Sequence, residues 1–242
     1  WINFESSLAK IDFSNKFPVP CHKVDETEEE DNSLMRGYLL YMDKLSSVFI
    51  TCAEEWWQIF FQKWIREVQI PIKKENYNSK SSLRKLFSDN KMLYFSFNYT
   101  KTLEKLYGIR EVTHIHNYVG QKLVFGHGED NAIYEEKGEQ SALGSSFLDE
   151  MVMAFRKNTD MQMIRYKKFF KQLDSNISKV YSYGFSYGRV DGVYIKRIIK
   201  NISPTAKWYF TEFEARNSEA LRIKKVKLRN YGFKGKFDVY EG

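Results

Sequence analysis

The sequence predicts an α/β fold in which a mostly parallel sheet carries helices on its faces and a helical subdomain is attached. After residue 89, short apolar runs alternate with helical patterns, which is typical of parallel strands joined by helices. Before that residue, apolar side chains recur at three- and four-residue steps, as on one face of a long helix. With 242 residues, 43% of them hydrophobic, the chain can bury a sizeable core.

Composition and charge narrow the class of protein. Cys21 and Cys52 are too few for a disulfide scaffold, and no secretory leader opens the chain, so we expect a cytoplasmic location. The longest uncharged apolar run, Val48 to Ala53, is far shorter than the roughly 20 residues that cross a bilayer, so we expect no membrane association. A net charge of +7 favours anionic partners such as nucleotides or nucleic acid. Because the chain begins at Trp1, we expect part of the natural N-terminus to be missing.

The predicted helical subdomain spans residues 1–88. Its acidic run from Asp25 to Asp31 contains no apolar residue, so we expect a solvated loop there. The apolar periodicity that starts at Leu34 predicts one helix from about Ser33 to about Val68, which Pro71 ends. Five aromatic side chains cover nearly every side of that helix, so some must pack against another element. They are Trp56, Trp57, Phe60, Phe61 and Trp64.

The predicted α/β domain spans residues 89–242. Apolar, β-branched and aromatic runs predict strands at 92–97, 112–116, 122–125, 179–185 and 208–213. Amphipathic patterns predict helices at 100–107, 147–155, 161–173 and 191–202. Because strands and helices alternate, we expect the carboxyl ends of the strands to share one edge, where open parallel sheets bind ligands.

Polar residues follow three of the predicted strands, and we expect these strand ends to converge on one cleft. An asparagine follows the first strand, and two histidines share one face of the second. The third set contains a glycine, which permits close approach of a ligand, and two polar side chains. In order, these residues are Asn98, then His114 and His116, then Gly184, Ser186 and Asp191.

Three of the four histidines lie close together in the sequence. For His114 we expect a hydrogen-bonded place in the core. His116 ends a strand, and its imidazole can act as a base near neutral pH. His127 stands between Gly126 and Gly128, and two placements remain open for it: the same cleft, or a turn that points into solvent.

Two other kinds of site fit these residues less well. A zinc site needs three or four ligands, and neither cysteine is near the histidines in the sequence, so we expect no metal. The segment from Gly184 to Gly188 fits the G-x-S-x-G spacing of a serine nucleophile. That chemistry needs an acid and then a histidine later in the chain, and no histidine follows His127. We therefore exclude a serine hydrolase of that order.

Several motifs resemble those of the AbiH family of bacteriophage abortive-infection proteins. They are SFNYTKTLEKLYG at 96–108, HIH at 114–116, LVFGHG at 123–128 and YGFSYG at 183–188, with Asp191 after them. The opening Trp1 and Glu5 also resemble an early W-x-x-x-E element of that family. The resemblance implies a role in defence against bacteriophage, with a phage protein among the partners.

The AbiH family is in turn similar to sirtuin-like folds, which are related to the Rossmann fold and surround NAD with a strand-end asparagine, a strand-end histidine and a late G-x-S loop. That resemblance implies a nucleotide hydrolase similar to NAD(P) glycohydrolases, with NAD as its substrate. Asn98 would hold a water or the nicotinamide ribose, and His116 would act on a ribose hydroxyl as general base. It also implies that a first strand and a glycine-rich turn like G-N-G-F-D are missing from this chain. The residues that would bind the dinucleotide are Tyr99, Gly126, His127, Gly184, Ser186 and Asp191.

Two functions from other classes remain open. The segment from Gly192 to Lys236 combines many lysines and arginines with aromatic residues such as Trp208 and Phe233. This composition suits a protein that binds or cleaves nucleic acid, and a solvated basic face has the same composition. The aromatic residues of the long helix suit a non-enzymatic sensor or assembly module, in which the chain forms a homo-oligomer or recognises a phage protein.

Overall fold

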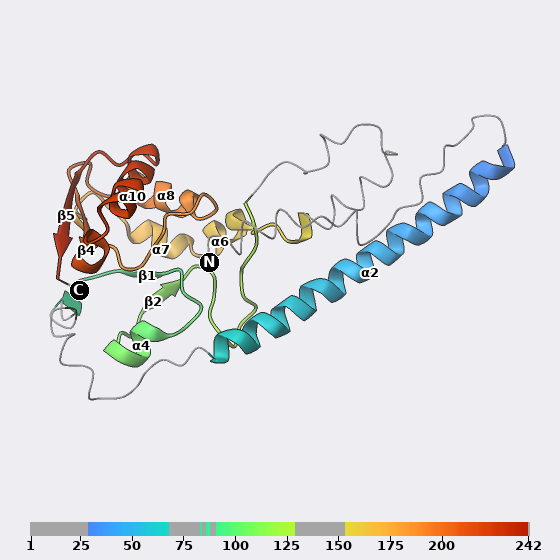
Figure 1. Cartoon of the computed structure of the whole chain (residues 1–242), viewed down its shortest axis with the longest axis horizontal. Helices are drawn as coiled ribbons and strands as arrows, with labels where there is room; N and C mark the ends of the chain where they lie inside the picture. The colour runs from blue at the N-terminus through green and yellow to red at the C-terminus, as the bar shows by residue number, and fades with distance from the viewer. Residues whose placement is uncertain (1–28, 68–82, 84–85, 88–90, 129–152, 242) are drawn as a thin grey trace. The chain divides into compact units, whose positions relative to one another are not determined.

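The computed structural model describes residues 29–67, 83, 86–87, 91–128 and 153–241 (Figure 1). Its contacts divide the chain into two compact units. The first contains Trp1–Trp64 and Phe125–Lys157, and the second contains Ile65–Val124 and Asn158–Gly242. That a helical subdomain ends at residue 88 stays a prediction.

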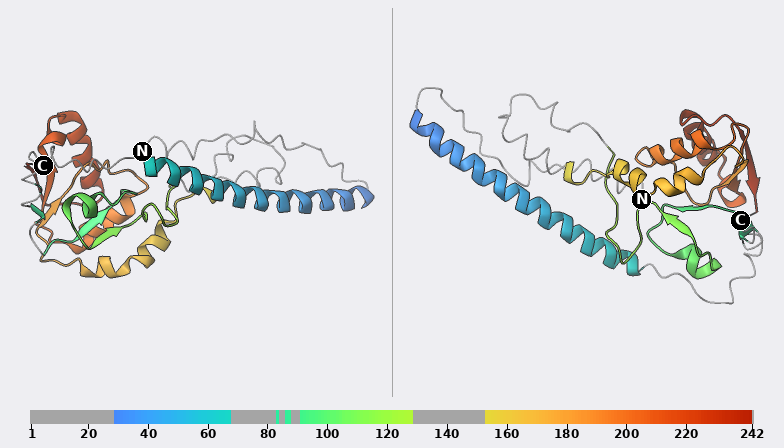
Figure 2. Two further views of the ribbon diagram at one scale, coloured as in Figure 1. Left: turned by 90° about the horizontal axis from the view of Figure 1, so that it is seen from below. Right: turned by 180° about the vertical axis from the view of Figure 1, so that it is seen from behind.

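The long helix of the first unit, α2, runs from Glu29 to Glu67, and both views of Figure 2 show it as one continuous helix. The predicted acidic loop is therefore wrong from Glu29 onward, and its residues 25–28 lie outside the described part of the chain. Acidic side chains at this end are favourable because the N-terminus of a helix carries partial positive charge. As predicted, some of the aromatic residues pack against another element: the ring of Phe61 lies 4.8 Å from that of Phe125.

The second unit begins with a two-stranded parallel sheet. Strands β1 (Tyr94–Ser96) and β2 (Val112–His114) pair with Ser96 opposite His114, and helix α4 (Thr102–Tyr107) connects them. Gly108 follows this helix with φ of 70°, a conformation that favours glycine. The strand predicted at 122–125 is wrong: among the described residues that segment belongs to no sheet, although the amide of Val124 donates to the carbonyl of His116 at 3.0 Å.

A three-stranded parallel sheet forms the rest of the second unit. Its strands are β3 (Lys179–Tyr181), β4 (Lys207–Thr211) and β5 (Lys236–Tyr240), in the order β3-β4-β5. The helices around it are α6 (Thr159–Arg165), α7 (Lys167–Gln172), α8 (Gly192–Asn201), α9 (Glu212–Ala215) and α10 (Ser218–Asn230). The single helix predicted at 161–173 is wrong, because the chain breaks into two helices at Tyr166.

The core of the three-stranded sheet lies against α8 and α10, which stand beside β4 and β5 in Figure 1. Trp208 and Phe210 alternate onto one face of β4, where Ile195 of α8 and Leu221 and Leu228 of α10 cover them. Both crossovers therefore cover the same face, as right-handed connections require when the strands follow one another in order.

A second core cluster lies next to the two-stranded sheet. Ile115 packs there with Phe169 and Phe170 of α7 and with Tyr194 of α8. Helix α8 thus contributes neighbouring residues, Tyr194 and Ile195, to two different clusters. The parallel strands and their flanking helices confirm the predicted α/β class. None of the described helices is long and apolar enough to cross a membrane.

Candidate functional site

The most distinctive polar contact of the second unit joins His116 to Asp191. His116 follows strand β2 and is 2% exposed. Its Nε2 atom lies 3.0 Å from Oδ1 of Asp191, which directly precedes helix α8. These two residues are far apart in the sequence, and the fold brings together the end of a strand and the start of a helix.

Aromatic rings surround the imidazole of His116. The ring of Tyr99 stacks on it with centroids 5.9 Å apart, and the rings of Phe97 and Tyr194 meet it edge-on at 5.6 and 5.9 Å. These rings keep water away from the imidazole, so its interaction with the carboxylate of Asp191 is stronger than it would be in water.

Asp191 does not play the structural role that its position suggests. Aspartate before the first turn of a helix usually accepts a hydrogen bond from the backbone of that turn. Asp191 occupies this position before α8, and its side chain makes no such bond. The carboxylate lies 3.0 Å from Nε2 of His116 instead, still at the positive end of the helix. A residue that departs from a local structural rule is a reason to look for a functional role.

His114 occupies a buried, fully hydrogen-bonded position, as predicted. It is 4% exposed. Its Nδ1 lies 3.0 Å from the carbonyl oxygen of Asn98, and its Nε2 lies 2.9 Å from Oε1 of Glu104. A carbonyl oxygen only accepts hydrogen bonds, so Nδ1 carries a hydrogen.

Asn98 lies on the surface after β1, with its backbone tied to the sheet. Its amide donates to Oγ of Ser96 at 3.2 Å, and its carbonyl accepts from His114. The neighbouring residue, Phe97, stacks on Phe185 with ring centroids 4.0 Å apart. The segments that follow β1 and β3 therefore meet through these rings, although β1 and β3 belong to different sheets.

The loop from Gly184 to Asp191 contains an exposed part and a buried anchor. Gly184 and Ser186 are exposed, and Gly184 has φ of 63°. The carbonyl oxygen of Ser186 accepts a hydrogen bond from Nζ of Lys227 at 3.1 Å. Tyr187 is fully buried with φ of 55°, rare for a residue other than glycine.

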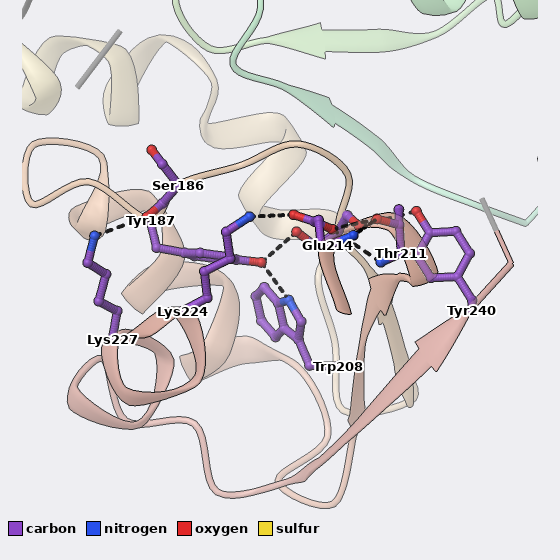
Figure 3. A network of polar contacts seen from close by, with 9 residues as sticks. Ser186, Tyr187, Trp208, Thr211, Glu214, Lys224, Lys227 and Tyr240 are labelled. Carbon is purple, nitrogen blue, oxygen red and sulfur yellow. Dashed lines mark hydrogen bonds and ion pairs between the residues drawn. The ribbon is translucent and has the colours of Figure 1, made fainter. Parts of the chain in front are cut away.

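Tyr187 fixes this loop to the three-stranded sheet (Figure 3). Its hydroxyl donates to Oγ of Ser182 at 2.6 Å and accepts from Nε1 of Trp208 at 2.8 Å. The hydroxyl of Tyr231 lies 3.2 Å from the carbonyl oxygens of Tyr187 and Gly188, to which it donates. Burial raises the pKa of the Tyr187 hydroxyl well above its usual value. The loop that ends at Asp191 is therefore anchored by hydrogen bonds to Ser182, Trp208 and Tyr231.

Of the remaining predicted site residues, Tyr99 belongs to the second unit. It is buried, and its hydroxyl donates to the carbonyl of Val124 at 2.8 Å. The hydroxyl of Tyr99 is thus bound to Val124, and its ring is the part of the side chain that contacts His116.

Gly126 and His127 belong to the first unit. The amide of His127 donates to the carbonyl of Phe155, and its carbonyl accepts from the amide of Lys157. A Cβ atom on Gly126 would lie 2.2 Å from the carbonyl oxygen of Phe155, so this close approach explains the glycine. His127 is 1% exposed, and the solvent-facing placement is therefore wrong. That His127 lines the site of His116 stays a prediction.

Several residues of this region escaped the sequence analysis. Tyr194 and Glu104 were not singled out, although Tyr194 follows Asp191 by one helical turn and such spacing places two residues on one face. The T-x-x-E pattern at Thr211 is a known helix-start signal, and Thr211 does end β4 and cap α9 with Glu214, which also pairs with Lys224 (Figure 3). The predicted extension of that strand to residue 213 is therefore wrong.

Two aromatic residues that the sequence offered for base stacking in the basic C-terminal segment lie in the core. Trp208 and Phe233 are 2% and 3% exposed, so they are not available to stack on nucleic acid bases. Arg229 donates to the carbonyl of Phe233 and lies 4.4 Å above the ring of Phe237. Within the described residues, no group of three or more histidine, cysteine or carboxylate side chains is arranged to hold a metal ion.

Comparisons with known proteins identify the family. No curated protein and no solved structure matches the chain. The family model described as bacteriophage abortive infection AbiH matches residues 1–212, which include β1, β2, β3 and the residues His116 and Asp191. On this match over most of its length, the chain belongs to the AbiH family.

Proposed function

We propose that this protein is an abortive-infection effector that hydrolyses NAD or a related nucleotide at a site centred on His116 and Asp191. The AbiH family suggests a function in abortive infection. The observation that carries the chemistry is the buried contact of 3.0 Å between Nε2 of His116 and Oδ1 of Asp191. A histidine oriented by a carboxylate is a recurrent arrangement for general-base catalysis.

Asp191 supports His116 as the base in this proposal. Its Oδ1 lies 3.0 Å from Nε2 of the ring, where a carboxylate favours the protonated form of the imidazole. The carboxylate then stabilises the imidazolium that forms. This division of roles requires a desolvated pair, which the rings of Tyr99, Phe97 and Tyr194 supply.

In the proposed reaction, His116 accepts a proton from a hydroxyl of the nicotinamide ribose. Water attacks the C1′ atom of that ribose, and the bond between C1′ and the pyridinium nitrogen breaks. The proton that the attacking water loses returns to the deprotonated ribose oxygen, and His116 releases its proton to solvent. Nicotinamide leaves with the bonding electron pair, and ADP-ribose is the second product. Asn98, exposed at the end of β1, positions the attacking water or the ribose.

The loop at Gly184 and Ser186 would contact the rest of the dinucleotide. Its exposed backbone follows β3, and Lys227 lies beside it with its Nζ on the Ser186 carbonyl. A nearby cation suits a phosphate-bearing ligand.

The test is to measure NAD in phage-infected cells that carry the protein or the His116→Ala variant. We expect NAD to fall after infection with the parent protein and to stay at its uninfected level with the variant, together with loss of phage protection. Glu219→Gln is the matched control, because Glu219 is exposed on α10 and contacts Arg222. Equal NAD loss with His116→Ala would refute the proposed catalytic role of His116.

A further inference from the structure

We propose that His114 is a positioning residue for Asn98 and that Glu104 holds the His114 ring in place. This inference rests on the proposed function for its effect on catalysis, and its structural part stands apart from it. The observation is that two side chains facing each other across the β1–β2 pair both bind the backbone of Asn98.

Ser96 and His114 are register partners in this sheet. Oγ of Ser96 accepts from the amide of Asn98 at 3.2 Å, and Nδ1 of His114 donates to the carbonyl of the same residue at 3.0 Å. Both partners are buried, at 8% and 4% exposure, whereas the side chain that they support is exposed. Asn98 is thus presented to its surroundings from a backbone clamped on both sides.

Glu104 binds the second nitrogen of the His114 ring. Its Oε1 lies 2.9 Å from Nε2 of the ring. Either the imidazolium donates to the carboxylate, or the carboxylic acid donates to the neutral ring. In both cases one proton lies between the two groups and Nδ1 keeps its own hydrogen for the Asn98 carbonyl. The other tautomer would place two acceptors against each other at Asn98.

The contact between Glu104 and His114 joins a helix and a strand that are close in the sequence. Glu104 lies on α4, which connects β1 to β2, so the pair also closes the β1–α4–β2 unit. Tyr118 packs edge-on against the ring of His114 at 5.3 Å, and Nζ of Lys101 lies 3.8 Å above the Tyr118 ring. These neighbours fix the ring plane and leave hydrogen bonding to the two nitrogens.

Two conservative substitutions of His114 separate the effect of its hydrogen bond to Asn98 from the effect of side-chain size. The amide nitrogen of His114→Asn falls near the place of Nδ1, whereas that of His114→Gln falls near the place of Nε2. His114→Asn should therefore keep the bond to Asn98, and His114→Gln should lose it. Likewise Glu104→Gln keeps a hydrogen-bonding partner for Nε2, whereas Glu104→Ala removes it.

The experiment combines hydrogen–deuterium exchange of the peptide around Asn98 with NAD turnover of the full chain. In His114→Gln we expect about tenfold faster exchange of the Asn98 amide, and kcat about 10- to 100-fold lower with little change in KM. His114→Asn and Glu104→Gln should stay close to the parent in both measurements.

Each result decides the matter. Equal hydrogen–deuterium exchange at Asn98 in His114→Asn and His114→Gln would show that His114 does not hold the backbone of Asn98. Separated exchange with equal turnover overturns the role in catalysis and leaves a structural clamp. If the parent protein hydrolyses no nucleotide, the proposed function fails, and the exchange comparison still supports or overturns the hold of His114 on Asn98.

Discussion

At the scale of single residues, Asp191 carries the clearest functional expectation. Asp191→Asn keeps the size of the side chain and removes the charge that stabilises a protonated His116. We expect NAD consumption to fall by about 10² to 10⁴-fold, with no more than a small shift in thermal stability. Turnover assays beside a thermal melt check both parts. Full activity in a folded Asp191→Asn protein would show that the carboxylate has no part in the reaction.

Tyr187 carries a second expectation, on the dependence of stability on pH. Burial raises the pKa of its hydroxyl above the usual tyrosine value of 10.0, so the unfolded chain releases this proton first. The stabilisation is complete below about pH 10 and is lost as the pH rises above it, at about 1.4 kcal/mol per pH unit. Urea unfolding between about pH 8 and pH 11 measures the slope, to which Tyr166, Tyr231 and Tyr240, whose pKa values are also raised by burial, contribute as well.

Tyr187→Phe should flatten that slope and lower stability near neutral pH. The substitution leaves Trp208 Nε1 and Ser182 Oγ without the Tyr187 hydroxyl, at a cost of about 1 to 3 kcal/mol. Tyr183→Phe, at a tyrosine that is 69% exposed, is the control at neutral pH. An unchanged slope in Tyr187→Phe would mean that this hydroxyl does not control the alkaline loss of stability.

The sequence could name most members of the candidate site and could not pair them. Polar residues after apolar strands pointed to Asn98, His116 and Asp191, because strand ends are where parallel sheets bind ligands. The contact between His116 and Asp191 depends on how α8 packs against the two-stranded sheet, which no local pattern specifies. Glu104 was missed for a similar reason, since a glutamate on a short exposed helix usually faces solvent.

At the scale of secondary-structure elements, the close approach at Gly126 gives a steric expectation. Gly126 has φ of 140°, and a Cβ there would lie 2.2 Å from the Phe155 carbonyl oxygen. Gly126→Ala should push the segment at Phe155 away and break its two backbone bonds to His127. We expect a loss of about 2 kcal/mol or more in urea unfolding.

Gly120→Ala is the matched control for this steric effect. Gly120 also has positive φ, 103°, with no atom within 4 Å of the Cβ position. Its substitution carries only backbone strain, about 1 to 2 kcal/mol. If both variants lose the same stability, the contact with Phe155 is not what requires glycine at position 126.

Secondary structure was predicted correctly where apolar residues recur over a long helix, and it was missed where charged residues interrupt that pattern. Helix α8 was expected at 191–202 and spans Gly192–Asn201, because its apolar residues recur at helical spacing. Helix α10 was not predicted. Only Leu221 and Leu228 of it are buried, and the lysines and arginines between them indicated a basic surface instead. The edge strand β5 was not predicted either, because Lys236 and Asp238 interrupt its apolar residues.

At the scale of the whole molecule, the family match ends before the sheet is complete. It covers residues 1–212, whereas α10 and β5 follow that point. A chain ending at residue 212 would lose Leu221, Leu228 and Phe233 from the cluster around Trp208. We expect such a chain to aggregate or to bind a hydrophobic dye, because a large apolar surface would be exposed. Gel filtration and dye fluorescence test this.

A truncated chain that runs as a compact monomer, binds no dye and keeps its aromatic circular dichroism would contradict this expectation. The completion of the sheet by α10 and β5 would then be dispensable for folding, and the cluster around Trp208 would have another cover.

The division of helix α8 between two clusters has a mechanical consequence. Tyr194 is packed beside the imidazole of His116, and its neighbour Ile195 is packed under strand β4. Close-packed interiors transmit small displacements instead of absorbing them. A ligand that displaces Asp191 at the start of α8 would therefore displace both core clusters together. The binding of a ligand at Asp191 and the rigidity of the three-stranded sheet would then be coupled.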